Sequence, residues 1–187
     1  MLDLTRYIPV AIVIIVYTVR MMELWKKRDL VPGEIKEGRT LNLFKLVGLF
    51  VVFFGIVEYF YAPKPTSWVI VAAGTLVSIL SFYIRWQAIK ALGKFWSLHV
   101  EIRSNHQFVR SGPFKFVRHP AYTSMIMEIV AIGLILQAPV SALVALLLFV
   151  PVLYKRITIE ERELTAKFGD AYSEYRRVTP ALLPIKF

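Results

Sequence analysis

Long apolar runs separated by short polar connections organise this chain. Three of them, residues 4–22, 43–61 and 68–86, approach the ~20 apolar residues that a helix needs to cross ~30 Å of hydrocarbon. Two shorter runs, residues 122–136 and 140–154, meet at Gln137-Ala138-Pro139 and predict a tight helical hairpin that leans or penetrates only part of the bilayer. The pattern therefore predicts an all-α, multi-pass membrane helical bundle of about five transmembrane helices.

After the fifth run the pattern becomes that of an amphipathic helix, whole or broken, over residues 156–177. At 100° per residue, one line along it carries Ile157, Leu164, Phe168 and Tyr175. Gly169 interrupts this helix or ends its first half. Glu161 projects within about 40° of the apolar line, where a carboxylate without a partner is unfavourable.

Composition supports the membrane class. The chain has 187 residues, of which 57% are hydrophobic and 19% charged, whereas soluble domains average about 45–50% and about 25%. We expect one integral membrane domain over residues 1–187, with three helices in 1–89 and a polar loop, the hairpin and the tail in 90–187. The first run reads as a retained helix, because no small-residue cleavage site follows it. With no cysteine, the chain cannot use disulfides, cysteine–zinc sites, thiol catalysis or S-palmitoylation.

The net charge of +10 lies beside the apolar runs, which favours cytoplasmic loops and anionic headgroups over nucleic acid. The first connection, the third connection and the tail are rich in Lys and Arg, whereas the second connection has only Lys64 and the fourth has none. By the positive-inside rule, the N-terminus is expected outside or in the lumen, and the third loop and the tail in the cytosol.

An Arg-His-Pro-Ala-Tyr motif at residues 118–122 directly precedes the fourth run. Such side chains are costly at a membrane boundary unless a polar partner satisfies them. Pro120 predicts a helix start, whose free N–H groups would attract a carboxylate or another anion. The simpler interpretation places Arg118 on lipid phosphate and Tyr122 in the interfacial aromatic belt. Headgroup contact does not require His and Tyr at this spacing, so a ligand site is favoured.

A second polar cluster, residues 156–161, follows the hairpin. Arg156 and Glu160 lie four apart, so the simple interpretation is a surface ion pair. In the functional interpretation, Arg156 holds an acidic substrate group through its fork of donors, and Glu160 or Glu161 binds a cationic ligand group. Because both clusters are expected in one compartment, they predict a single site at the membrane–water interface.

Other patterns narrow the chemistry. His99, His106 and His119 share a loop, but no acidic residue has the spacing of a known metal motif, so no metal is expected. The nine glycines never form Gly-x-Gly, which argues against a dinucleotide fingerprint or a Gly-rich phosphate loop. Glu58 and Glu128 fall inside predicted spans; each is either a functional group or the partner of a neighbour such as Arg85.

Six short motifs follow one another along the second half of the chain: Gly93-Lys94-Phe95-Trp96-Ser97, His106-Gln107-Phe108-Val109, Gly112-Pro113-Phe114, Arg118-His119-Pro120-Ala121-Tyr122, Glu160-Glu161-Arg162-Glu163-Leu164 and Phe168-Gly169-Asp170-Ala171-Tyr172. Residues 90–187 therefore resemble the isoprenylcysteine carboxyl methyltransferase family of integral membrane enzymes, which is related to phospholipid methyltransferases. The specific signal is the pair of Arg-His-Pro-x-Tyr and Glu-Glu-x-x-Leu motifs at this spacing.

The resemblance implies S-adenosylmethionine as the methyl donor. It implies a cofactor site made of His99, His106, Gln107, Phe108, Val109, Phe114, Arg118, His119, Pro120, Ala121, Tyr122, Glu160 and Glu161. Arg156 would face and bind the acceptor, and His119 would serve as a base where the acceptor needs one. Two positions depart from the family pattern: Phe114 stands where Tyr is usual, and Ser124 replaces a frequent Gly.

The resemblance leaves the acceptor open. An isoprenylcysteine-type carboxylate is the first choice, and a phospholipid amine, an alkyl phenol and a small thiol are alternatives. A carboxylate acceptor needs no general base, whereas an amine, thiol or phenol could need His119. Two other functions stay open: an NADPH-dependent membrane reductase similar to the sterol reductases, and a membrane scaffold without enzymatic activity.

Overall fold

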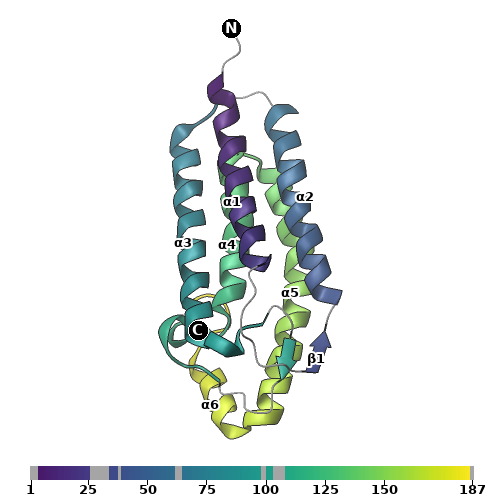
Figure 1. Cartoon of the computed structure of the whole chain (residues 1–187), viewed down its shortest axis with the longest axis vertical. Coiled ribbons are helices and arrows are strands. Elements are labelled where there is room, and N and C mark those ends of the chain that lie inside the picture. Colours follow the sequence, from purple (N-terminus) through teal and green to yellow (C-terminus); the bar gives the residue numbers. More distant parts are fainter. Residues whose placement is uncertain are drawn as a thin grey trace.

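The computed structural model describes residues 4–25, 34–37, 39–61, 65–97, 100–102 and 108–185. Over these residues the chain forms a helical bundle, which confirms the predicted all-α class (Figure 1). Its helices are α1 (Ile8–Trp25), α2 (Arg39–Tyr61), α3 (Trp68–Leu92), α4 (Pro120–Ile135), α5 (Pro139–Phe168) and α6 (Asp170–Val178), with 3₁₀ turns at Leu4–Tyr7, Gly93–Phe95 and Gly112–Lys115. Two short strands, β1 (Glu34–Glu37) and β2 (Val100–Ile102), pair antiparallel in the connections.

The bundle has the dimensions and surface of a membrane protein. By length and composition, α1, α2, α3 and α5 can each cross a membrane. Helix α4 has 16 residues and reaches about 24 Å, as expected for the short arm of a hairpin. Large apolar side chains such as Leu46, Phe53, Leu76 and Leu147 point outward and are exposed. This surface is what lipid contact requires, since lipid tails do not drive apolar groups inward.

The second arm of the hairpin differs from the prediction. The sequence pattern predicts a fifth apolar helix over residues 140–154 and a separate tail helix after it. In the structure, the apolar run and the first half of the tail both belong to α5, which has 30 residues and runs without a break from Pro139 to Phe168. Pro151 lies inside it and removes only one donor from the helix. Gly169 then ends the helix in the left-handed region, at φ 55°, which confirms its predicted role as a break. One continuous helix therefore carries both the membrane span and the second polar cluster.

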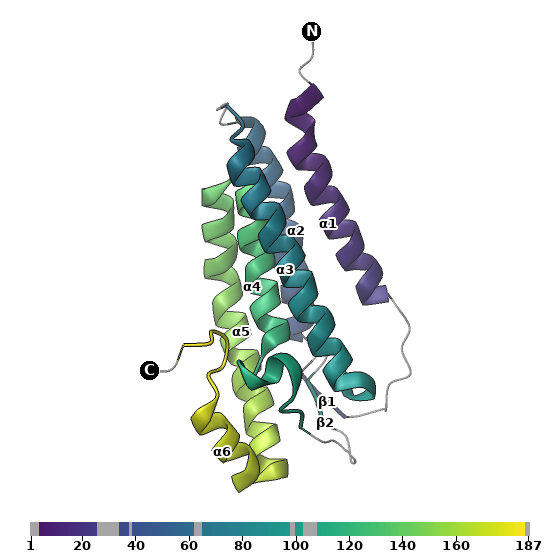
Figure 2. The same ribbon diagram turned by 90° about the vertical axis from the view of Figure 1, so that its left-hand side faces the viewer.

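Helices α3 and α4 pack closely and lie side by side in both views (Figures 1 and 2). A Cβ at Gly74 would lie 2.8 Å from the backbone nitrogen of Ile135, so the contact requires a glycine. At the far end of the bundle, the Glu58 carboxylate accepts the N–H groups of Val140 (3.1 Å) and Ser141 (2.7 Å). Glu58 thus satisfies the start of α5, and it is not the partner of Arg85.

The helices alternate in direction, so α1 and α3 end where α2 and α4 begin (Figure 1). This end, which also carries α6, is called the site end below. Helix α5 extends beyond the others there, and α6 folds back beside it (Figure 2). The first connection, the third connection and the tail therefore meet at one end of the bundle, and both polar clusters are brought together.

Candidate functional site

The loop before α4 is fixed against α6. Gly112 adopts φ 61° and opens the 3₁₀ turn predicted around Pro113. The side chain of Phe114 is buried, and its carbonyl accepts the Tyr175 hydroxyl at 2.7 Å. Burial raises the pKa of Tyr175 to about 12, so its hydroxyl keeps the proton that this bond requires. Position 114 lacks a hydroxyl, but its backbone oxygen still ties the loop to the tail.

The C-terminal tail runs back along the start of α4. The N–H of Arg118 donates to the carbonyl of Pro180 at 2.9 Å, and the N–H of His119 donates to that of Ala181 at 3.0 Å. These two N–H groups lie just before the helix start that was predicted to attract an anionic ligand, and the tail already occupies them. The partners lie about 60 positions away in sequence, so no local signal marks them. The tail therefore holds the motif in place and takes up its first backbone donors.

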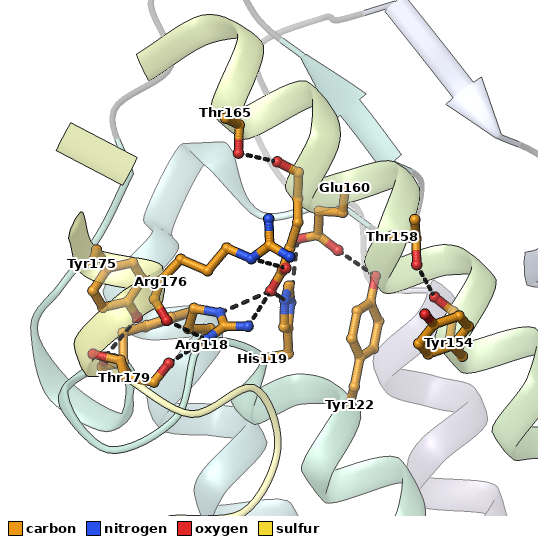
Figure 3. A network of polar contacts seen from close by, with 12 residues as sticks. Arg118, His119, Tyr122, Tyr154, Thr158, Glu160, Thr165, Tyr175, Arg176 and Thr179 are labelled. Atoms are coloured by element: carbon orange, nitrogen blue, oxygen red, sulfur yellow. Dashed lines mark hydrogen bonds and ion pairs between the residues drawn. The ribbon is translucent and has the colours of Figure 1, made fainter. Parts of the chain in front are cut away.

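The carboxylate of Glu161 is buried and is the centre of an ionic hub made of Arg118, His119, Glu161 and the exposed Arg176. Figure 3 shows Arg118, His119 and Arg176 of this hub. Its Oε1 accepts from Arg118 Nε at 2.8 Å and lies 3.0 Å from His119 Nε2. Its Oε2 lies 3.1 Å from Arg176 Nε. One carboxylate thus joins α4, α5 and α6, which explains why it lies near the apolar line of the helix. With three basic partners, Glu161 positions other residues and does not project into open space.

Glu160, its neighbour, has a different environment. Its side chain is 31% exposed against 8% for Glu161, and Oε2 accepts the Tyr122 hydroxyl at 2.6 Å. Its Oε1 lies 3.9 Å from His119 Nδ1. The sequence left open which of the two carboxylates meets a ligand, and this geometry favours Glu160.

Arg156 is buried, so the interpretation as a surface ion pair is wrong. Its Nε donates to the Tyr122 hydroxyl and its Nη1 donates to Thr40 Oγ1, both at 2.9 Å. The guanidinium also lies over the ring of Phe44, 5.4 Å from its centre. Tyr122 therefore connects Arg156 to Glu160 through one hydroxyl. No local sequence pattern indicates that α2 contributes Thr40 and Phe44, because these residues lie more than 110 positions from Arg156.

A cavity opens between these groups. It holds about 1040 Å³ of space between its side chains, a volume that includes open solvent at its mouth. Ten of the predicted site residues line it: Phe108, Val109, Phe114, Arg118, His119, Pro120, Ala121, Tyr122, Arg156 and Glu160. Glu161 stands behind the wall. His99, His106 and Gln107 lie outside the described residues.

Aromatic rings form the wall of the cavity on the α6 side. The ring of Phe108 lies 4.9 Å from Phe168, 5.6 Å from Tyr172 and 5.9 Å from Tyr175, measured between ring centres. Arg110 lies over Phe108 at 4.6 Å and donates to the carbonyl of Ala171. Such rings offer flat faces to a heteroaromatic ring or to a cation. Tyr172 appears in a sequence motif, but only the fold shows that it faces the cavity.

Comparison with known proteins shows the family of the chain. The sequence model of the isoprenylcysteine carboxyl methyltransferase (ICMT) family matches residues 72–166, about half of the chain. The chain belongs to this family. The matched stretch contains most of α3, all of α4 and most of α5, and thus the motif at 118–122 together with Arg156 and Glu160. Helices α1, α2 and α6 of this family member lie outside the match.

Three relatives illustrate the range of the likeness. The chain is 32% identical over 108 residues to protein-S-isoprenylcysteine O-methyltransferase of Schizosaccharomyces pombe, covering 57% of this chain and 46% of the relative. It is 30% identical over 101 residues to the uncharacterized protein YpbQ of Bacillus subtilis (54% and 59%). It is 28% identical over 134 residues to the cobalt-zinc-cadmium resistance protein CzcN of Cupriavidus metallidurans (63% and 62%). The chain therefore spans about half to three fifths of these relatives.

Proposed function

We propose that this family member is an S-adenosylmethionine-dependent methyltransferase that acts on a lipophilic acceptor, first of all an isoprenylcysteine-type carboxylate. The observation that carries the proposal is the convergence of the 118–122 motif with Arg156 and Glu160 on one cavity at one end of a membrane bundle. Two relatives of the chain carry the name protein-S-isoprenylcysteine O-methyltransferase, which supports the proposal.

The side chains that line the cavity suit the chemistry of S-adenosylmethionine. The partly exposed carboxylate of Glu160 suits the amino group of the cofactor, and Arg118 on the cavity wall offers a cation to its carboxylate. The rings of Phe108, Tyr172 and Tyr175 suit adenine, since heteroaromatic rings stack on aromatic side chains. When bound, this cofactor supplies a methyl group on a positively charged sulfur. We therefore retain the predicted cofactor set, with Glu161 in a supporting position.

The residues on the membrane side of the cavity suit an acidic acceptor. Arg156 reaches the cavity from α5, and Thr40 and Phe44 hold its guanidinium from α2. A guanidinium in this position can orient a carboxylate through a charged hydrogen bond. A carboxylate acceptor needs no proton removed. For an amine, thiol or phenol, His119 is the candidate base, and Glu161 fixes its ring through Nε2.

The site end is proposed to face the cytosol, where the methyl donor is soluble. Its connections hold most of the Lys and Arg residues, and the opposite end holds few. The N-terminus would then lie outside or in the lumen, and a lipophilic acceptor would arrive from the bilayer. We also propose that residues 1–187 form one integral membrane domain.

The decisive experiment uses purified protein in detergent or nanodiscs. Calorimetry should detect S-adenosylmethionine binding, and labelled methyl groups should appear on N-acetyl-S-farnesyl-L-cysteine. A melting temperature that rises with NADPH and not with S-adenosylmethionine would instead support the reductase alternative. A melting temperature that neither compound raises would contradict the proposal and favour a membrane scaffold without enzymatic activity. Mass spectrometry of a lipid extract incubated with the labelled donor would identify the acceptor.

A further inference from the structure

A second cavity lies beside the site, within the membrane-spanning part of the bundle. It holds about 770 Å³ of space, including the open space at its mouth, and residues of α1, α2 and α4 form most of its wall. Leu41, Phe44 and Met125 line both cavities, so the two adjoin at these side chains. Along α2 the wall runs from Leu41 to Val51, which is about 15 Å of helix. This side cavity is therefore a mostly apolar extension of the candidate site.

Helix α1 forms the outer wall of the side cavity and is weakly attached to the bundle. It contributes Val16, Tyr17, Arg20 and Met21 to the wall. Of the α1 side chains that the structure describes, residues 8–23, three are buried: Pro9, Val13 and Arg20. Figure 2 shows α1 set apart from the other long helices. In the half nearer the site, Arg20 is thus the buried attachment of this helix.

That attachment is an ionic cluster within the helical bundle, made of Arg20, Glu23, Arg85 and Glu128. Arg20 donates through Nε to Glu128 Oε2 of α4 at 3.0 Å and also pairs with Glu23. Glu23 in turn accepts from Arg85 Nε of α3 at 2.9 Å. Two cations and two anions give a cluster without net charge. Arg85 and Glu128 lie within the family match, whereas Arg20 and Glu23 lie outside it.

The cluster also touches the candidate site. The Arg85 guanidinium lies 5.2 Å from the ring centre of Trp96, and Trp96 lines the site cavity. Arg20, Arg85 and Glu128 line the side cavity. The cluster therefore stands next to both cavities. Buried ion pairs add little net stability compared with apolar packing, so four charges at a lipid-facing helix need another explanation.

We propose that the side cavity receives the hydrocarbon part of the acceptor, and that the ionic cluster positions α1 as its movable outer wall. The proposal rests on the proposed function for the identity of the occupant. Few apolar contacts hold the site half of α1, and charged hydrogen bonds are directional and separable. Helix α1 can thus move aside as one body and return to a defined position. Arg20, Glu23, Arg85 and Glu128 are positioning residues, because they act through α1.

Cysteine labelling tests the wall without any reference to methyl transfer. The native chain has no cysteine, so Val51→Cys places one thiol on the buried wall of the side cavity. Its alkylation by N-pyrenylmaleimide in phosphatidylcholine nanodiscs reports how often α1 moves aside. The pair Arg20→Gln with Glu128→Gln removes one cation and one anion and keeps charge balance. Loss of a charged hydrogen bond shifts the opening equilibrium by about 1.4 kcal/mol or more, so alkylation should rise about tenfold.

A matched control separates wall movement from loosening of the whole bundle. Ala145 is fully buried on α5 and lines neither cavity, so Ala145→Cys should stay equally protected in both backgrounds. Arg20→Lys keeps the charge and should keep the thiol at position 51 protected. Equal increases at positions 51 and 145, or no increase at 51, would overturn the positioning role. Failure of the wild-type protein to bind S-adenosylmethionine would remove the proposed function, and the labelling result would stand independently.

The occupant is tested by two acceptors with the same carboxylate, N-acetyl-S-farnesyl-L-cysteine and N-acetyl-S-butyl-L-cysteine. When the ionic cluster no longer holds α1, the farnesyl acceptor should lose much of the binding energy of its tail. The butyl acceptor should lose little, because its tail is short. The ratio of kcat/KM values, farnesyl over butyl, should therefore fall about fivefold or more in the Arg20→Gln/Glu128→Gln protein, with S-adenosylmethionine affinity unchanged. An unchanged ratio in a protein whose position 51 has become reactive would overturn the assignment of the cavity to the acceptor tail.

Discussion

Two adjacent carboxylates face two different parts of the site. Glu161 belongs to the ionic hub behind the cavity wall, where Arg118, His119 and Arg176 surround it. Glu160 belongs to the cavity face, where it shares Tyr122 with Arg156. One step along a helix rotates the side chain by about 100°, and this rotation separates the hub from the cavity face. A buried acid among bases can therefore hold the wall of a cavity together without lining the cavity itself.

The largest expected effect comes from the hub. Glu161→Gln leaves the buried side chains of Arg118 and His119 without their shared anion, a change that typically costs about 3 kcal/mol or more. The melting temperature should fall by roughly 5–10 °C, and S-adenosylmethionine affinity should fall with it, because the loop and α6 lose their common partner. Thermal melts and calorimetry in detergent measure both quantities. A Glu161→Gln protein with the melting temperature of the wild type would show that the hub does not stabilise the site.

Glu160→Gln should separate affinity from stability. The proposed contact with the cofactor amino group is a charged hydrogen bond, worth about 1.5–3 kcal/mol, so affinity should fall roughly 10- to 100-fold. The side chain is partly exposed and keeps its oxygen for Tyr122, so the melt of the apo protein should stay close to wild type. Calorimetry showing wild-type affinity would exclude Glu160 as a cofactor ligand and reopen the choice between the two carboxylates.

Arg156 should affect the acceptor and not the cofactor. Arg156→Lys keeps a cation but loses the fork of donors that reaches both Tyr122 and Thr40. We expect kcat/KM for N-acetyl-S-farnesyl-L-cysteine to fall about tenfold, or about 1.4 kcal/mol, with S-adenosylmethionine affinity unchanged. Steady-state kinetics and calorimetry on one preparation test this split. Thr40→Val is the matched control, since it removes one partner of Arg156 and should produce a smaller effect of the same kind.

The membrane helices and the position of the motifs could be predicted from local patterns. Predicted runs at residues 43–61 and 68–86 fall within α2 and α3, and Pro120 begins α4 as its residue type indicates. These features follow from hydrophobic length and helix-start preferences, which a short window of sequence contains. The length of α5 was underestimated, because the change from apolar to amphipathic composition resembles a boundary although the backbone continues through it.

The contacts that complete the site lie beyond such a window. The bond of Arg156 to Thr40 joins α5 to α2, and the tail carbonyls of Pro180 and Ala181 take the N–H groups of Arg118 and His119. Each depends on how helices far apart in sequence are packed. Sequence patterns identify which residue types are costly to bury, and only the packing decides whether the compensation is a ligand or another part of the chain.

The smallest expected effect tests the link between the loop and α6. Tyr175→Phe removes one buried hydrogen bond to the carbonyl of Phe114, worth about 1 kcal/mol, so the melt should fall slightly and S-adenosylmethionine affinity only a few-fold. The pH dependence gives a sharper signature. Because burial raises the pKa of Tyr175 from its ordinary value of 10.0 to about 12, its contribution to stability is complete below pH 10.0 and is lost as pH rises toward 12. Melting temperatures should therefore decline more steeply across this interval in the wild-type protein than in Tyr175→Phe. If the melting temperatures of the two proteins fall in parallel, the Tyr175 hydroxyl does not link α6 to the loop at Phe114.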